Sequence, residues 1–348
     1  PLLPMYLYYM EYRYIGNSGL RVSPICMGTM GFGTWSDKSE AFRILDASYE
    51  RGINFFDTAE VYPVPPTAEL AGLTEEIFGE WVQTKPRDSL IIATKVAGAA
   101  SGWIVPPIRY GLTAIDRHHI ENAIEGSLRR LNIEYVDLYQ VHWPDNVVPI
   151  EESMEALDRL VESGKARYLG TSNENAYGLT KSNTVAKYEG LTRFQSIQNN
   201  FSLLNRRFFD ELANVCRQEN VSLLPYSPIG GGVLSGKYQQ GEMPSQTRFG
   251  DYMKEGDSRQ KLMAQRFVNR DTLSSTEKYL EISKKAGLSP VTMATAWSMH
   301  WDFVASTIVG VRNVDQLDEI FSAFDVRLTD ELLKECDEVH QQYKYPMG

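Results

Sequence analysis

Short apolar runs alternate with longer amphipathic segments over most of the chain. The runs are rich in β-branched and aromatic residues, and they occupy residues 24–30, 53–59, 90–96, 136–143, 166–172, 194–200, 221–228 and 305–311. Continuous rather than alternating apolarity is typical of parallel strands that are covered on both faces. The pattern therefore predicts eight buried strands.

The segments between the runs have the spacing of amphipathic helices. Within residues 116–132, for example, Ile120, Ile124 and Leu128 recur every four positions. Further helices are expected over residues 39–52, 150–164 and 328–343. Repeated strand–helix units favour the α/β class and a closed (β/α)8 TIM barrel, with an extra helix at the C-terminal end.

The N-terminal residues, the glycines after the first run and the long connections also indicate how the barrel is built. Residues 12–23 have two β-rich arms around a turn, which predicts an N-terminal β-hairpin that could plug the barrel floor. An open doubly wound sheet is the alternative, and it would carry G-x-G-x-x-G after the first strand. Residues 28–33 read G-T-M-G-F-G, a different spacing that weakens this alternative without excluding it. The connections 60–74, 97–116 and 229–271 exceed normal loop length, so we expect them to be functional or mobile.

Amino-acid composition and net charge limit the kinds of binding partner that the protein can have. Hydrophobic residues make up 43% of the 348 positions and the formal net charge is −10, which argues against nucleic acid or an anionic membrane as partner. The three cysteines are far apart, as in proteins of a reducing compartment, and we expect a cytoplasmic location. We expect residues 12–348 to form a single domain and residues 1–11 to be an extension, disordered or left by cloning.

The sequence contains no metal-binding motif and only an imperfect match to a nucleotide-binding motif. No HExxH sequence or cysteine cluster occurs, so no metal site is expected. Residues 231–238 read GGVLSGKY, close to a phosphate-binding P-loop, but a tyrosine stands where Mg²⁺ binding needs serine or threonine. An NTPase is therefore a minor alternative.

Polar residues stand at or just after the ends of three runs. They are Asp57 with Tyr62 after the second run, Lys95 in the third and His142 in the fourth. Singly, each could be a cap or packing residue. Strand ends of a parallel barrel meet at one rim, where a desolvated Lys95 needs a carboxylate partner such as Asp57.

This group of residues suggests proton donation. A lysine ~4 Å from a phenol contributes up to roughly 4 kcal/mol at an effective dielectric near 20. We therefore expect Lys95 to lower the pKa of Tyr62 by about one to three units, which would make the phenol a better donor to a carbonyl oxygen. His142, expected to be neutral, would orient that carbonyl.

The segments around these residues resemble those of the aldo-keto reductases. MGTMGFG (27–33), DTAEVY (57–62), IIATKV (91–96) and LYQVHWP (138–144) match the family's motifs in order and spacing. The resemblance runs from about residue 12 to the C-terminus and is strongest with the Tas-type branch. It implies a (β/α)8 barrel that reduces aldehydes and ketones with NADPH, with Asp57, Tyr62, Lys95 and His142 as the catalytic residues.

The resemblance also implies binding residues. The cofactor-binding positions would be Thr29, Met30, Asp57, Ser172, Asn173, Gln198, Tyr226, Ser227, Pro228, Ile229, Gly230, Lys237, Arg248, Gly310, Arg312, Gln316 and Glu319. Three of these are cations expected near phosphates, which favours NADPH over NADH. The substrate pocket would include Trp35, Tyr62, His142 and Trp143, with Trp103, Ile104 and Tyr110 as further candidates.

The resemblance to this family does not decide whether the protein is an enzyme or a regulatory subunit. Potassium-channel β subunits of the same superfamily retain the four catalytic residues, so a cofactor-binding regulatory subunit with little turnover is an alternative to a carbonyl reductase. The partner expected for a reductase is a small carbonyl compound. Neither the physiological substrate nor the oligomeric state is indicated by the sequence.

Overall fold

The computed structural model describes residues 10–100, 106–240 and 243–347. Its main sheet has parallel strands in the order β10-β3-β4-β5-β6-β7-β8-β9. These are β3 (Ile25–Gly28), β4 (Phe55–Asp57), β5 (Ile91–Val96), β6 (Val136–Val141), β7 (Ala166–Ser172), β8 (Phe194–Gln198), β9 (Ser222–Leu223) and β10 (Thr307–Val309). Isolated bridges from Leu223 to Val304 and from Tyr226 to Ile308 join the two outer strands. The sheet is thereby closed, the predicted barrel is confirmed, and the open-sheet alternative is wrong.

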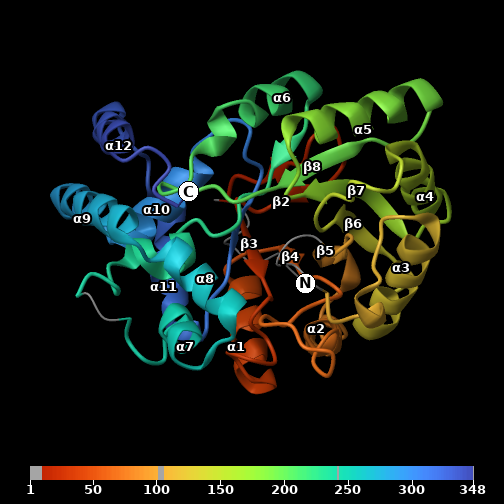
Figure 1. Cartoon of the computed structure of the whole chain (residues 1–348), viewed down its shortest axis with the longest axis horizontal. Coiled ribbons are helices and arrows are strands. Elements are labelled where there is room, and N and C mark those ends of the chain that lie inside the picture. The colour runs from red at the N-terminus through yellow and green to blue at the C-terminus, as the bar shows by residue number, and fades with distance from the viewer. Residues whose placement is uncertain (1–9, 101–105, 241–242, 348) are drawn as a thin grey trace.

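Helices surround the strands, as Figure 1 shows. They are α1 (Lys38–Glu50), α2 (Leu73–Val82), α3 (Arg117–Leu131), α4 (Ile150–Glu162), α5 (Ala176–Glu189), α6 (Leu212–Glu219), α7 (Arg248–Glu255), α8 (Ser258–Phe267), α9 (Arg270–Lys285), α10 (Pro290–Met299), α11 (Leu317–Phe321) and α12 (Asp330–Gln342). Side-chain caps begin several of them; Asp116, for instance, accepts from His119 N before α3. The extra C-terminal helix is α12, as predicted. Among the described residues, no helix is both long and apolar enough to cross a membrane.

The segment 229–271 is not the long irregular loop that was expected. It contains the 3-10 helix η5 (Gly230–Ser235) followed by α7 and α8, and α8 packs against both α7 and η5. Asp257 and Gln260 form a reciprocal capping box at the start of α8. That D-x-x-Q spacing was the sequence signal for the helix, which covers one side of the barrel mouth.

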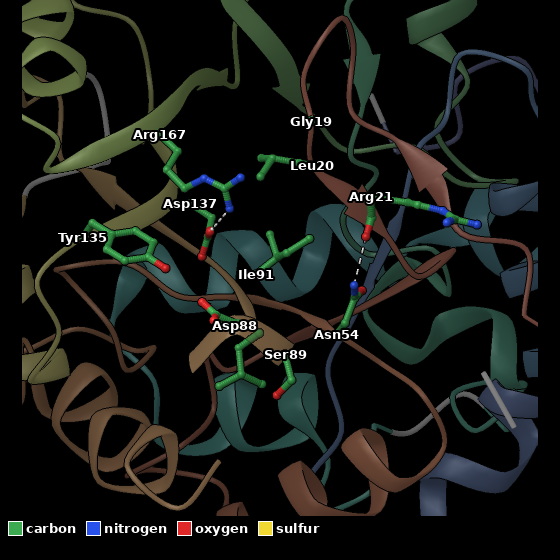
Figure 2. Close-up of a pocket in the computed structure, with 11 residues that line it drawn as sticks. Gly19, Leu20, Arg21, Asn54, Asp88, Ser89, Ile91, Tyr135, Asp137 and Arg167 are labelled. Atoms are coloured by element: carbon green, nitrogen blue, oxygen red, sulfur yellow. Dashed lines mark hydrogen bonds and ion pairs between the residues drawn. The ribbon is translucent and has the colours of Figure 1, made fainter. Parts of the chain in front are cut away.

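The barrel floor is closed by the predicted hairpin, formed by β1 (Arg13–Tyr14) and β2 (Arg21–Val22). Ile15 and Leu20 are buried in one cluster with residues of the barrel interior. A cavity of about 230 Å³ remains there, beside Gly19 and Leu20 (Figure 2). Asp137 pairs with Arg167 at 2.7 Å across it. The floor therefore has charges that neutralise each other, and the larger cavity lies at the opposite end. Of the expected extension 1–11, residues 1–9 lie outside the described part of the chain.

Candidate active site

Four polar side chains from three neighbouring strands meet at the carboxyl end of the barrel. Lys95 is fully buried, and its ammonium donates to the Asp57 carboxylate and, at 2.8 Å, to the carbonyl oxygen of Thr58. Lys95 Nζ lies 5.1 Å from the centroid of the Tyr62 ring. The His142 ring stands nearly perpendicular to the Tyr62 ring, with centroids 5.6 Å apart. The residues singled out from the strand ends thus lie together.

Two glutamines hold the second oxygen of the Asp57 carboxylate. Gln140 and Gln198 donate their Nε2 groups to Asp57 Oδ2 at 3.0 and 2.9 Å. Gln198 was expected to bind cofactor; it lines the cavity, but its amide nitrogen is directed to Asp57. Gln140 was missed by the sequence analysis. Its signal was a polar residue inside a buried strand, which requires a polar partner.

The pKa of Tyr62 is raised, so the expected net decrease is wrong. Burial favours the neutral phenol, and this outweighs the lowering effect of the Lys95 charge, while the Asp57 carboxylate raises the pKa further. Burial alone would lower the pKa of Lys95, but the charge and hydrogen bond of Asp57 raise it, so the amine stays charged. Burial, followed by the charge of Lys95, holds the pKa of His142 well below its usual value, so the ring is neutral as expected.

A cavity of about 840 Å³ opens beside these residues. Nearly all the residues expected at the site line it: Thr29, Met30, Trp35, Asp57, Tyr62, His142, Trp143, Ser172, Asn173, Gln198, Tyr226, Ser227, Pro228, Ile229, Lys237, Arg248, Gly310, Arg312, Gln316 and Glu319. Lys95 does not line the cavity because it is fully buried. Gly230 is also excluded, because it packs under Leu204. Helix α8 adds lining residues that the sequence analysis missed, including Met263 and Arg266.

One end of the cavity is rich in positive charge. Partial desolvation, followed by the charge of Arg312, lowers the pKa of Lys237. Arg248 has a buried Nε without a hydrogen-bond partner in the described structure. Arg312 contacts Asp251 at 3.2 Å. Trp35 was expected to line the substrate pocket, but its ring lies 5.2 Å from the Arg248 guanidinium and 5.4 Å from that of Arg312. The structure thus places Trp35 with the cations.

The chain can hold a phosphate at this end. Gly231 and Gly232 have φ values of 63° and 95°, and a Cβ on Gly232 would lie 2.7 Å from Lys237 Nζ. Glycine is therefore needed for the backbone to approach the ammonium so closely. These glycines follow β9 in a 3-10 helix, whereas a P-loop leads from a strand into an α-helix. The donor set fits a phosphorylated ligand without fitting an NTPase.

Between the two ends, a hydrogen-bond chain borders the cavity. The Tyr226 hydroxyl donates to Asn173 Oδ1 at 2.7 Å, and Asn173 Nδ2 donates to the carbonyl oxygen of His142 at 2.9 Å. Ser172 Oγ donates to the Gln198 carbonyl at 2.7 Å. Burial raises the pKa of Tyr226 to about 12, against the lowering effect of Arg266. The Tyr226 ring is thus a fixed, uncharged surface of the cavity.

The opposite end of the cavity is apolar. Tyr62 and Trp143 pack in a cluster with Met30, Val64 and Ile108. Prolines at 65, 66, 106 and 107 add to this wall. Tyr110, a further candidate for the pocket, is fully exposed and is not among the residues that line this cavity. The candidates Trp103 and Ile104 lie outside the described residues.

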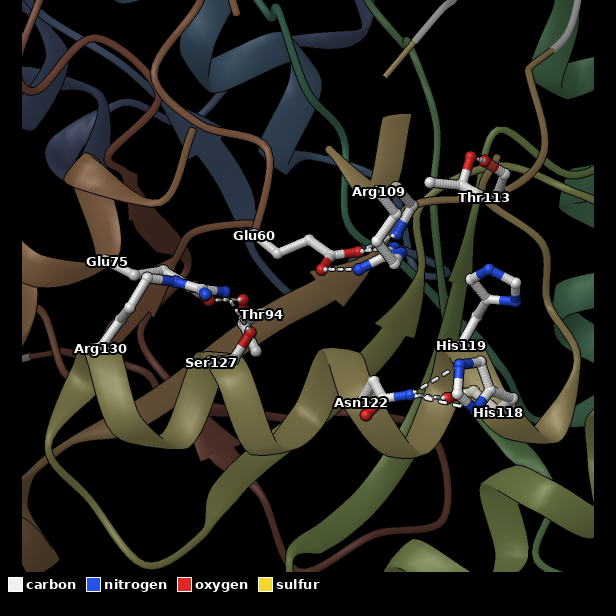
Figure 3. A network of polar contacts seen from close by, with 12 residues as sticks. Glu60, Glu75, Thr94, Arg109, Thr113, His118, His119, Asn122, Ser127 and Arg130 are labelled. Carbon is white, nitrogen blue, oxygen red and sulfur yellow. Dashed lines mark hydrogen bonds and ion pairs between the residues drawn. The ribbon is translucent and has the colours of Figure 1, made fainter. Parts of the chain in front are cut away.

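Metal chemistry has no support in the described residues, where no cluster of histidine, cysteine or carboxylate side chains could hold an ion. On α3, His119 contacts Asp116 at 2.8 Å. His118 contacts Asn122, as Figure 3 shows. Both contacts lie within α3 and its N-cap, so each side chain has a local structural role.

Comparisons with known proteins agree with this geometry. The sequence model of the aldo/keto reductase family matches residues 24–341. Protein tas of Escherichia coli is 38% identical, with 97% of this chain and 99% of that protein covered. An uncharacterized oxidoreductase of Bacillus subtilis, YrpG, is 32% identical over 95% of this chain and 96% of its own length. A probable voltage-gated potassium channel subunit beta of rice, Oryza sativa, is also 32% identical, over 95% of this chain and 97% of its own.

Proposed function

The chain belongs to the aldo/keto reductase family, and from that premise we propose that it reduces aldehydes and ketones to alcohols with NADPH. One observation carries the proposal. The buried Lys95–Asp57 pair lies against the Tyr62 ring, and Tyr62 and His142 line a cavity with an apolar end and a cationic end. Such a site suits a neutral carbonyl at one end and a phosphorylated dinucleotide at the other.

Tyr62 is the proton donor in this proposal. Its raised pKa keeps the phenol protonated throughout the neutral range, so the proton is available when negative charge develops on the carbonyl oxygen. The Lys95 ammonium stabilises the phenolate that forms, and Asp57 keeps that ammonium charged and fixed. His142, being neutral, can place an N–H beside the carbonyl oxygen without a second positive charge next to Lys95. NADPH, when bound, supplies the hydride.

The cationic end would hold the cofactor. Ser172 and Asn173 offer hydroxyl and amide groups to a carboxamide, and the Tyr226 ring offers a flat face to the nicotinamide. Segment 227–230 and the cations Lys237, Arg248 and Arg312 would hold the phosphates. We infer NADPH rather than NADH because a 2′-phosphate adds negative charge where the chain concentrates positive charge.

The substrate we expect is an uncharged carbonyl compound with an apolar or aromatic substituent. The wall around Tyr62 and Trp143 consists of apolar side chains and prolines. We also propose a cytoplasmic location, since all three cysteines are buried free thiols, which a reducing compartment maintains.

The test starts with binding and proceeds to turnover. Thermal shift should show a larger stabilisation by NADPH than by NADH, and 4-nitrobenzaldehyde should be reduced in an assay that follows NADPH absorbance. Tyr62→Phe should lower kcat by at least about 10³-fold while the NADPH-induced shift is retained. A fully active Tyr62→Phe protein would refute the assignment of the proton donor.

A second candidate function follows from the relatives named as potassium channel β subunits. The chain would then bind NADPH and a protein partner but turn over slowly. Tight NADPH binding without reduction of any carbonyl in a broad panel, together with a stable partner in a pull-down, would favour this candidate over the reductase.

A further inference from the structure

Three residues after Asp57 in the sequence, Glu60 forms a partly buried ion pair with Arg109, which Figure 3 shows. Glu60 is 3% exposed, and both of its oxygens accept from Arg109, each at 2.8 Å. Glu60 Oε1 also accepts from Ala97 N at 2.7 Å. The pair therefore joins the ends of β4 and β5 to the segment that follows β5.

Arg109 lies in a turn whose backbone conformation must be stabilised by contacts with the surrounding structure. Arg109, Tyr110 and Gly111 have φ values of 48°, 57° and 75°, so two consecutive non-glycine residues adopt the left-handed conformation. Such conformations persist only where the surrounding structure imposes them. The side chain of Tyr110 is fully exposed and imposes nothing, and Thr113 ties the segment to Gly98 O at 2.6 Å only further along. Backbone hydrogen bonds from Gly111 N to Ile108 O at 2.9 Å and from Leu112 N to Arg109 O at 3.0 Å close the turn on itself. The Glu60 carboxylate is the contact that ties Arg109 to the barrel.

The three residues before Arg109 lie at or beside the cavity wall. Pro106 and Pro107 line the cavity, and Ile108 packs on the cluster that contains Tyr62 and Trp143. Because they are directly joined to Arg109, any shift of its backbone moves the surface that faces the substrate.

Arg109 does not contact the reacting groups itself. It is not among the cavity-lining residues, and its charge is neutralised by Glu60. Burial alone would lower the pKa of Arg109, but the hydrogen bonds and charge of Glu60 raise it, so the guanidinium stays charged. The pair therefore acts through the backbone, and it leaves the wall uncharged.

We propose that Glu60 and Arg109 are positioning residues that fix the substrate wall at Pro106 and Pro107, together with Ile108, which packs on the Tyr62 cluster. The proposal rests on the proposed carbonyl reduction. The pair sets the affinity for the carbonyl compound without contributing to the chemical step or to cofactor binding.

The same network contains a matched control. Arg130 on α3 donates to the buried carboxylate of Glu75 at 2.7 Å, and neither residue lines the cavity (Figure 3). Arg109→Gln and Arg130→Gln each remove a guanidinium from a buried carboxylate, so both should destabilise the fold. Only Arg109→Gln should raise KM for 4-nitrobenzaldehyde, by about 10-fold, with kcat and the NADPH Kd nearly unchanged. Arg109→Lys should restore KM in part, since it returns the charge without the two-pronged contact.

Hydrogen exchange provides a readout that is independent of turnover. Amides at 108–113 should exchange faster in Arg109→Gln than in Arg130→Gln. The double variant Glu60→Gln/Arg109→Gln leaves no unpaired buried charge, so it covers the case in which Arg109→Gln fails to fold. The proposal is overturned if KM and exchange at 108–113 match the wild type, or if Arg130→Gln raises KM equally. If the wild type reduces no carbonyl, the proposed function fails, and the exchange comparison still tests whether the pair fixes this segment.

Discussion

The two ends of the large cavity handle positive charge in opposite ways. At the apolar end, Arg109 meets a buried carboxylate of the chain itself, Glu60, and contributes no charge to the cavity. At the cationic end, Arg248 and Lys237 make no ion pair within the described residues; Arg248 donates to a methionine sulfur at 3.5 Å. The charge at the apolar end is therefore balanced within the chain, whereas at the cationic end a bound phosphorylated ligand, as proposed above, would balance it.

The two ends should therefore select their ligands in different ways, one by its shape and the other by its charge. A wall whose charges are paired internally selects its ligand through fixed contacts, and its affinity should respond weakly to salt. A set of unpaired cations attracts any phosphorylated ligand, and other anions in solution can compete for the same cations. The Tyr62–Lys95–Asp57 group lies where the two ends meet, so the comparison can be tested from either side.

The largest effect is expected from Lys95→Met, which removes the charge at the meeting point. Asp57 would be left buried and unpaired, and its charge would make loss of the Tyr62 proton harder. We expect kcat to fall by about 10³-fold and stability by about 3–5 kcal/mol. Single-turnover kinetics and urea unfolding measure the two effects. Lys284→Met, at an exposed position, is the control, and the assignment fails if both variants turn over normally.

Removal of a cation from the cationic end should affect the cofactor alone. We assign Arg312 to the 2′-phosphate, so Arg312→Ala should weaken NADPH binding by about 10- to 100-fold, as expected when a hydrogen bond to a charged group is lost. NADH affinity and the KM for the carbonyl compound should change little. Fluorescence titration with both nucleotides, in low and high salt, tests this prediction. Equal weakening of NADH and NADPH binding would contradict the assignment to the 2′-phosphate.

A smaller effect should distinguish two tryptophans of the cavity. Trp35 stacks with two guanidiniums at the cationic end, so Trp35→Leu should weaken NADPH binding by about 5-fold, typical of one lost cation–π contact. Trp143→Leu should instead raise the KM for aromatic aldehydes. Exchange of these two outcomes would show that Trp35 belongs to the substrate end, as its sequence position first indicated.

The smallest effect concerns pH. The pKa of His142 is lowered on folding, so below pH ~6.5 the unfolded chain binds a proton that the folded chain does not. The free energy of unfolding should therefore decrease as pH falls below ~6.5, by at most about 1.4 kcal/mol per pH unit for this group. Urea unfolding at pH 7.5 and 5.5 should show a smaller loss in His142→Gln. Equal losses in both proteins would mean that His142 charges without penalty in the folded state.

The sequence was sufficient for those features that follow from periodicity and strand ends. The eight runs predicted the barrel, and Asp57, Lys95 and His142 could be found because polar residues at the ends of buried strands are rarely accidental. The roles assigned to these residues stay a proposal until variants are measured.

Other features depended on distances that no pattern contains. Glu60 and Arg109 are 49 positions apart, and only the folded chain shows that they pair. The sign of the Tyr62 pKa shift required the degree of burial to be weighed against one nearby charge. The contacts of Trp35 with Arg248 and Arg312 could not be foreseen, because these arginines come from α7 and from the segment before α11.

The closure of the barrel has a consequence for how ligand and fold depend on each other. Its last seam is held by isolated bridges, one of which joins Tyr226 to Ile308, and both residues also border the large cavity. A dinucleotide lying across segments 226–230 and 308–312 would bridge the two segments at which the barrel closes with the fewest hydrogen bonds between strands. The seam should then be the first part of the barrel to open in the apo protein and the part that gains most protection when the cofactor is added.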